Sequence, residues 1–173
     1  MSKGEEAGQD RSARTASRAA ISGLQLRRAQ VADLPKIVAL FRLPDEGVRR
    51  DAEGSLDPFD AAYVEALGAT TDDNALYVAE LSLEVVGTFQ LTFVRHVAYR
   101  GGLIAQIENV IVAPEARNQG IGTAMMADAI ARARARGAFR VQLTSNKRRT
   151  RAHRLYERLG FESSHEGMKL ALS

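Results

Sequence analysis

The pattern of hydrophobic and polar positions predicts a body built from both strands and helices. The runs "NALYVAEL" and "EVVGTFQLTFVRHV" are rich in apolar, β-branched and aromatic residues and are joined by a polar turn at 82–84. Two such runs with a short connection are typical of a β-hairpin. Three further strands are predicted by "GLQLRRAQ", "AFRVQLTS" and "GMKLALS", and a fourth by the alternating stretch "LIAQIENVIV".

Four other stretches carry apolar residues at helical spacing and predict helices: 31–41, 57–68, 123–136 and 151–159. In the first, Asp33 stands where a side chain can cap a helix, and Pro35 lies early enough to be tolerated. In the second, Phe59, Tyr63 and Leu67 share one face. The helices therefore have apolar faces with which to cover a sheet.

The chain is predicted to form one domain behind a tail. Residues 1–22 are small, polar and charged without sustained periodicity, which predicts a mobile N-terminal tail. No internal repeat or linker divides residues 23–173, so we expect one mixed α/β domain of the α+β type. The irregular stretch 42–56 is a candidate to lie over a substrate site.

Composition excludes several classes of site. The chain has no Cys, so a disulfide framework, a thiolate metal site and a Cys nucleophile are excluded. Its three scattered His argue against zinc, and we expect no metal. The N-terminus has no secretory apolar core, and no apolar run reaches the about 18 residues of a membrane span. We therefore expect a soluble, cytoplasmic protein.

Charge is concentrated in one part of the chain. The formal net charge is +3, yet residues 132–158 hold ten Lys or Arg against a single acid. Such a segment indicates a bound polyanion, either a phosphorylated cofactor or a nucleic acid. Arg132, Arg134 and Arg136 have a simpler explanation, because cations near a helix C-terminus interact favourably with the helix dipole.

The segment "RNQGIG" places two glycines between a predicted strand and a predicted helix. A strand, a tight turn and a helix N-terminus present backbone N–H groups that bind phosphate. Gly120 and Gly122 lack Cβ atoms that would hold a pyrophosphate away, although glycines here would also suit close packing. The Lys-Ser/Thr pair of a P-loop and the spacing of the dinucleotide fingerprint are both missing.

The wider string supports the phosphate interpretation. "VIVAPEARNQGIG" followed by "HRLYERLGF" resembles the GNAT superfamily of N-acetyltransferases over about residues 24–173. Within it, "LTSNKRRTRAHRLYERLGF" and "SHEGMKLAL" are similar to the branch of aminoalkylphosphonate N-acetyltransferases, in which His165 matches a substrate-site His. The resemblance implies a mixed, mostly antiparallel sheet of six to seven strands, splayed at its centre and flanked by about four helices.

The resemblance also implies acetyl-CoA as cosubstrate. Its pantetheine arm is expected to pair, like an added strand, with the backbone of three consecutive residues, Val110, Ile111 and Val112. The pyrophosphate is expected at the turn formed by Arg117, Asn118, Gln119, Gly120, Ile121, Gly122 and Thr123. Arg149, with Arg148 and Arg151, could reach the adenosine phosphate. Asn146 could bond the cofactor or cap the next turn.

Two side chains are candidates for proton transfer. Glu108 lies among apolar residues on the strand expected beside the acetyl group, where partial desolvation would suit a general base. It could equally be an ordinary solvent-facing carboxylate. Tyr156 is the candidate acid for the departing thiolate, or else it only packs on Phe161. A bulged strand near Val110 would free a backbone N–H for the oxyanion.

The leading hypothesis is transfer of the acetyl group of acetyl-CoA to a primary amine, by direct attack because no Cys can carry the acyl group. The substrate is expected to be a small molecule. The alternatives are an acyl-CoA-binding regulatory module without turnover and a protein N-terminal or lysine acetyltransferase. We expect acetyl-CoA and an amine acceptor as partners, no nucleic acid and no membrane, and a homodimer is left open.

Overall fold

A computed structural model describes residues 21–44 and 57–170. The predicted tail up to residue 20, the irregular stretch 45–56 and the last three residues lie outside the described part. The strands are β1 (Leu24–Arg28), β2 (Asn74–Leu81), β3 (Glu84–His96), β4 (Gly102–Val112) and β5 (Ala138–Leu143). The helices are α1 (Leu34–Phe41), α2 (Ala61–Gly68), α3 (Ile121–Ala135) and α4 (Thr150–Arg158), with short 3₁₀ turns η2 (Val31–Asp33), η3 (Val97–Tyr99) and η4 (Pro114–Ala116).

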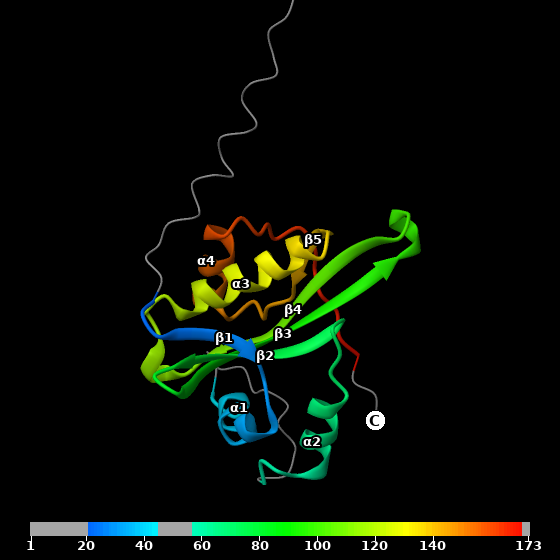
Figure 1. Cartoon of the computed structure of the whole chain (residues 1–173). Helices are drawn as coiled ribbons and strands as arrows, with labels where there is room; N and C mark the ends of the chain where they lie inside the picture. Colours follow the sequence, from blue (N-terminus) through cyan, green and yellow to red (C-terminus); the bar gives the residue numbers. More distant parts are fainter. Residues whose placement is uncertain (1–20, 45–56, 171–173) are drawn as a thin grey trace, which may run out of the picture.

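The strands form one sheet in the order β1-β2-β3-β4-β5, in which only β4 and β5 run parallel. Helices α3 and α4 lie on one side of this sheet, and α1 and α2 on the other (Figure 1). The predicted hairpin is confirmed as β2 and β3, which are joined through Ser82 and Leu83 in the left-handed region. The mixed, mostly antiparallel architecture with four α-helices is confirmed.

The predicted strand count is wrong for the described part of the chain, which has five strands. The missing strand is "GMKLALS", whose residues 167–170 are extended coil without a sheet partner. Met168 and Leu170 are 93% and 85% exposed. Alternation predicts a strand because one face of the strand is buried. The alternating side chains of this segment are exposed, so the prediction fails here.

The core between the sheet and α3 is built from alternate residues of the central strands. Phe89 and Leu91 on β3 are fully buried, and so are Met125, Met126 and Ala129 on α3. Successive strand residues point to opposite faces. The period-2 pattern of β3 therefore places its large side chains under α3 and fixes that helix beside β4.

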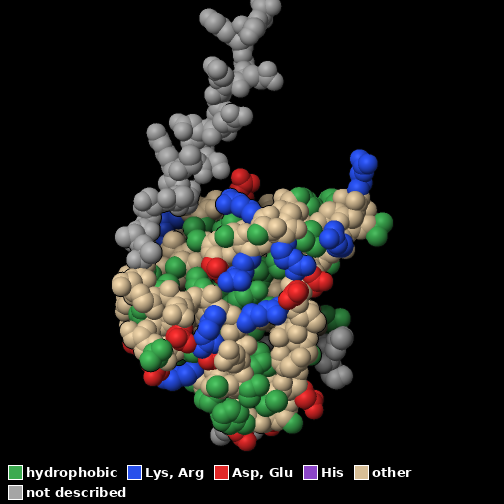
Figure 2. All heavy atoms as spheres, viewed as in Figure 1, with side chains coloured by type: hydrophobic (Ala, Val, Ile, Leu, Met, Phe, Trp, Pro, Cys, Tyr) green, Lys and Arg blue, Asp and Glu red, His purple; other side chains and the backbone are tan. Residues whose placement is uncertain are grey.

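The basic C-terminal end of α3 serves the fold. Arg132 lies over the Tyr77 ring and pairs with Asp128, and Arg136 lies over the Phe93 ring. Figure 2 shows Lys and Arg side chains on this face with acidic and apolar groups between them. The structural explanation of these cations is confirmed, because both also lie at the helix C-terminus that they were expected to stabilise.

Asp33 occupies the N-cap position of α1, but its side chain makes no cap hydrogen bond to that helix. Its carboxylate forms a two-pronged ion pair with Arg27, at 2.7 and 2.8 Å, and accepts the Gln30 backbone N–H at 2.7 Å. The hydrogen bonds from Arg27 outweigh burial and hold the pKa of the carboxyl below its usual range. Glu80 shares the same guanidinium group. These contacts tie β1, β2 and the start of α1 together.

Candidate active site

Strand β4 carries a bulge at the position where a catalytic role is expected. Thr88 pairs with Ile111 and Gln90 pairs with Glu108, so β4 contains one residue more than β3 between these pairs. Asn109 lies at the bulge with a φ of 52°. An extra residue interrupts the ladder and frees backbone groups. The expected bulge near Val110 is confirmed.

The C-terminal part of β4 has no strand beside it on the side of β5. The pairing of β4 with β5 ends at Ile107 and Leu143, where β5 itself ends, whereas β4 continues to Val112. Ala113 donates its N–H to Val86 O, so alternation along the strand directs the backbone groups of Ile111 toward β3 and those of Val112 toward the open edge. This open edge lies where the sheet was expected to splay.

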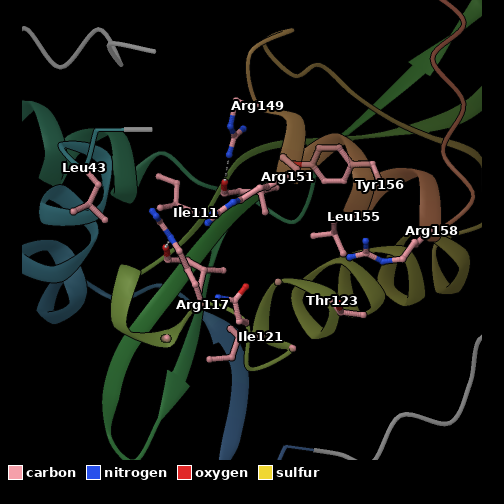
Figure 3. Close-up of a pocket in the computed structure, with 17 residues that line it drawn as sticks. Leu43, Ile111, Arg117, Ile121, Thr123, Arg149, Arg151, Leu155, Tyr156 and Arg158 are labelled. Atoms are coloured by element: carbon pink, nitrogen blue, oxygen red, sulfur yellow. Dashed lines mark hydrogen bonds between the residues drawn. The ribbon is translucent and has the colours of Figure 1, made fainter. Parts of the chain in front are cut away.

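Two arginines occupy this open edge. Arg149 Nη2 donates to Val110 O at 3.2 Å, and Arg117 Nε donates to Val112 O at 3.1 Å. Figure 3 shows the two side chains approaching β4 from different loops, together with Arg151 from α4. Two backbone acceptors two residues apart thus face a common space, which is the arrangement that an added extended chain would use.

The turn after β4 has the backbone conformation of an anion cradle. Asn118 and Gly120 lie in the left-handed region, with φ values of 63° and 87°, and α3 begins immediately afterwards at Ile121. The first turn of a helix leaves backbone N–H groups without partners inside the helix. These groups and the positive end of the α3 dipole therefore point toward the same side as the open edge of β4.

These features enclose one pocket of about 560 Å³. Most of the predicted cofactor residues line it: Val110, Ile111, Val112, Arg117, Asn118, Gly120, Ile121, Gly122, Thr123 and Arg149. Tyr156 lines it as well. Arg151, expected with Arg149 near the adenosine phosphate, lines it too, and the lining residues absent from the predicted site are Leu43, Ala116, Ala152, Leu155 and Arg158. The sequence carries a signal for those on α4, since Ala152, Leu155 and Tyr156 share one apolar helix face, and that face lines the pocket.

Five of the candidate residues lie outside this pocket: Glu108, Gln119, Asn146, Arg148 and His165. Gln119 is exposed and donates from its side chain to Glu115 O at 3.0 Å. Asn146 accepts the Arg148 backbone N–H at 3.0 Å, which is the turn-capping role that was the alternative to cofactor binding. Glu108 is exposed, so the partial desolvation expected for it is absent. Its exposure follows the alternation of β4, in which Ile107 is buried and Glu108 points to the opposite face.

Tyr156 combines features of both predicted roles. It is 6% exposed, and its ring meets Phe161 edge to face with a centroid separation of 6.0 Å. It nevertheless lines the pocket, on the side formed by α4 (Figure 3). Packing therefore fixes the ring at the border of the pocket. His165, by contrast, is exposed and lies beside Ser164 Oγ.

No helix in the described ranges is long and apolar enough to cross a membrane.

Comparison with curated proteins identifies relatives that match part of the chain. The aminoalkylphosphonate N-acetyltransferase of Salmonella typhimurium is 38% identical over 82 residues, which are 47% of this chain and 53% of that protein. A glucosamine 6-phosphate N-acetyltransferase of Trypanosoma brucei brucei is 31% identical over 88 residues, 51% of this chain and 58% of that protein. The matched regions span about half the length of these two relatives.

A solved structure matches over a greater length. A Bacillus halodurans C-125 protein described as a transcriptional regulator has a TM-score of 0.78 and 38% identity, covering 86% of this chain and 99% of that one. The model of the acetyltransferase (GNAT) family matches residues 36–161, which include the open edge of β4, the glycine turn and α4. The chain therefore belongs to the GNAT acetyltransferase family.

Proposed function

We propose that this protein transfers the acetyl group of acetyl-CoA to a primary amine. The observation that carries the proposal is the meeting of two features in one pocket: the open edge of β4 and the glycine turn at the start of α3. The first offers backbone acceptors at Val110 and Val112 to an extended amide chain, and the second offers N–H groups to a pyrophosphate.

The residues present fit this cosubstrate. Gly120 adopts a positive φ without difficulty, and a Cβ there would have only Ile21 Cδ1 as a near neighbour, at 3.7 Å. Arg117 and Arg149 can exchange their bonds with β4 carbonyls for bonds to phosphate oxygens. When bound, acetyl-CoA supplies an activated acetyl thioester. The chain supplies the groups that hold it and move protons.

Glu108 is proposed as the general base. It precedes the bulge on β4 and its carboxylate is exposed, so an amine or an intervening water can reach it. An alkylamine with a pKa near ~10 is mostly protonated at neutral pH and must lose a proton before it attacks. Glu108 accepts that proton, while the backbone N–H at Val110 is proposed to stabilise the oxyanion.

Tyr156 is proposed as the acid that protonates the departing thiolate. The nitrogen–carbon bond forms, the carbon–sulfur bond breaks, and the phenol proton goes to sulfur. The second proton, lost by the nitrogen as the amide forms, returns through solvent to the phenolate, and the proton on Glu108 is released to solvent. Direct transfer needs no acyl-enzyme, in keeping with a chain that lacks Cys. The edge-to-face contact with Phe161 supports this role, because it fixes the ring at the border of the pocket.

We propose a small amine as acceptor, with aminoalkylphosphonates and amino sugar phosphates as the first classes to try. This choice rests on the names of the two partial relatives, both of which act on an amine that also carries a phosphorus oxyanion. Protein N-termini and lysine side chains are the alternative acceptors. The name of the Bacillus halodurans relative makes a regulatory module without turnover the second candidate function.

The test is an acceptor panel with acetyl-CoA, in which free CoA is measured with a thiol reagent and acetylated product by mass spectrometry. Stoichiometric release of CoA and formation of product with at least one amine class is the expected result. Tight acetyl-CoA binding without acetylation of any small amine, peptide or protein acceptor would instead support the regulatory module.

A further inference from the structure

A series of side-chain hydrogen bonds joins the β2–β3 hairpin to the bulge of β4. Asn74 Oδ1 on β2 accepts a hydrogen bond from Gln90 Nε2 on β3 at 2.7 Å. Gln90 Oε1 in turn accepts a hydrogen bond from Asn109 Nδ2 at 3.4 Å. Gln90 is therefore the residue that connects the hairpin to the bulge.

The strand register explains why Gln90 is the residue that reaches the bulge. Gln90 pairs directly with Glu108, so these two side chains lie beside each other on one face of the sheet. The β3 residue opposite the bulge is Phe89, whose side chain is fully buried on the other face, under α3. Phe89 offers no polar group to Asn109, and the register brings the amide of Gln90 to it instead.

The contact supports a backbone conformation that is uncommon at a residue other than glycine. Asn109 has a φ of 52°, in the left-handed region. Asparagine tolerates this region better than most residues, and such a conformation persists where its surroundings fix it. The Asn109 side chain is exposed and bonded to Gln90, whereas the next residue, Val110, is buried in the core. Gln90 and the packing of Val110 thus hold the bulge on its two sides.

We propose that Gln90 is a positioning residue for acetyl transfer and that it acts through Asn109. This inference rests on the proposed function, in which the Glu108 carboxylate and the Val110 N–H act on the reacting atoms. Glu108 and Val110 flank Asn109, so the φ and ψ of Asn109 set the direction of one group relative to the other. Holding these two angles fixes both groups in one geometry before the amine binds, and small misplacements of reacting groups are costly to the rate.

A role in strand pairing alone would give a different pattern, and Thr92 shows which. Thr92 Oγ1 donates to the same Asn74 oxygen as Gln90, at 3.1 Å, and its hydroxyl is bonded within the hairpin rather than to the bulge. Thr92→Val removes this bond and keeps the shape of the side chain. It is therefore the matched control for a loss of pairing between β2 and β3.

The test combines activity with hydrogen exchange in the ligand-free full chain. Gln90→Met keeps the length of the side chain and removes its amide, and it should lower kcat about tenfold while KM for acetyl-CoA stays within about twofold. The Ile111 amide, which faces β3 just beyond the bulge, should exchange faster in this variant. Thr92→Val should lose a comparable amount of thermal stability and keep both kcat and the exchange rate of Ile111.

A double-mutant cycle shows whether Gln90 acts through Asn109. Asn109→Gly permits the left-handed φ and removes the side-chain amide, so it should lower kcat by a similar factor. Because each single variant breaks the same hydrogen bond, the double variant should lose little more than either one. Losses that multiply would overturn the inference, since the two residues would then act independently.

The remaining outcomes are also decisive. An unchanged kcat in Gln90→Met, or an unchanged exchange rate of Ile111, would each overturn the inference. The same fall in kcat in Thr92→Val would overturn it too, because the hydrogen bonds would then serve only the fold. Faster exchange in Gln90→Met, with no turnover of any acceptor by the unmodified protein, would overturn the proposed function and with it the role in catalysis, but not the hold on the bulge.

Discussion

A Cβ atom on Gly122 would lie 3.4 Å from Leu155 Cδ2, so this glycine lets the first turn of α3 approach α4 closely. Gly120, two residues earlier, has a different role. Its φ of 87° is the reason that glycine is needed, since a Cβ there would make only ordinary van der Waals contact, with Ile21 Cδ1 at 3.7 Å. The two glycines of "RNQGIG" therefore differ: Gly122 lies in the contact between α3 and α4, and Gly120 supplies a backbone conformation.

Replacing Gly120 with Val should weaken acetyl-CoA binding at least tenfold, or about 1.4 kcal/mol. A β-branched side chain disfavours the left-handed conformation and would project into the proposed phosphate cradle. Isothermal titration calorimetry measures the effect, and circular dichroism shows whether the fold is retained.

Gly137→Val is the matched control for backbone strain. Gly137 has a φ of 73° at the other end of α3 and does not line the pocket. The Gly137→Val protein should lose about as much thermal stability as the Gly120→Val protein and should keep its affinity for acetyl-CoA. A folded Gly120→Val protein with unchanged affinity would show that this turn does not hold the cosubstrate.

The sequence was sufficient to predict the elements whose apolar pattern corresponds to burial. Phe89 and Leu91 alternate on β3 because one face of that strand is covered by α3. The same alternation at Met168 and Leu170 predicted a strand that is absent from the described part of the chain, where both side chains are exposed. An apolar pattern shows which side chains could be buried, whereas the tertiary contacts determine which side chains are buried.

The site was predictable where it depends on backbone conformation. Gly120 and its neighbours could be placed in a tight turn before α3, because glycine signals a positive φ. The exposure of Glu108 is the alternative that alternation already offered, because buried Ile107 separates it from Gln106 on the same face of β4. The bulge at Asn109 could not be predicted, because it leaves no clear mark in the residue types. Arg158 was missed because only the folded arrangement shows which arginines of a basic segment line the pocket.

Glu108→Gln should lower kcat/KM by about 100-fold at neutral pH, because it keeps the shape of the side chain and removes the base. The loss should shrink at alkaline pH, where more of the amine acceptor is already neutral. The pH–rate profile of the variant measures this. A profile that matches the unmodified protein would exclude Glu108 as the base.

Tyr156→Phe should lower kcat by about 100-fold while acetyl-CoA affinity and the thermal midpoint change little. The substitution removes only the hydroxyl and keeps the ring that packs on Phe161. Single-turnover measurements are required, because slow product release would mask a loss in the chemical step.

An acyl donor with a more acidic thiol distinguishes the two proton-transfer roles. Such a leaving group needs less protonation, so it should restore rate to Tyr156→Phe and not to Glu108→Gln. Equal restoration of both variants, or of neither, would contradict the assignment of Tyr156 as the acid.

Asp33→Asn should destabilise the fold at neutral pH by about 1–3 kcal/mol, because it breaks the ion pair with Arg27. The pKa of Asp33 is lower in the folded state, so its stabilisation is present above the unfolded-state pKa and is lost as pH falls through the folded value. Thermal unfolding between about pH 7 and pH 2 should therefore show a steeper acid loss for the unmodified protein.

Asp72→Asn is the comparison for this effect. Its ion pair with Arg28 is at the surface, with the Asp72 side chain 89% exposed, and such pairs contribute little. A loss of stability in Asp72→Asn as large as that in Asp33→Asn would mean that the Arg27 pair has no special structural role.

Amide hydrogen exchange with and without acetyl-CoA tests most directly whether the open edge of β4 is the binding surface. The segment Val110–Val112 and the first amides of α3 should gain protection together when acetyl-CoA is added. The amides of β2, whose two edges are already paired with β1 and β3, should be unchanged and serve as the internal reference. Saturating acetyl-CoA that leaves exchange at Val110–Val112 unaltered would contradict the account.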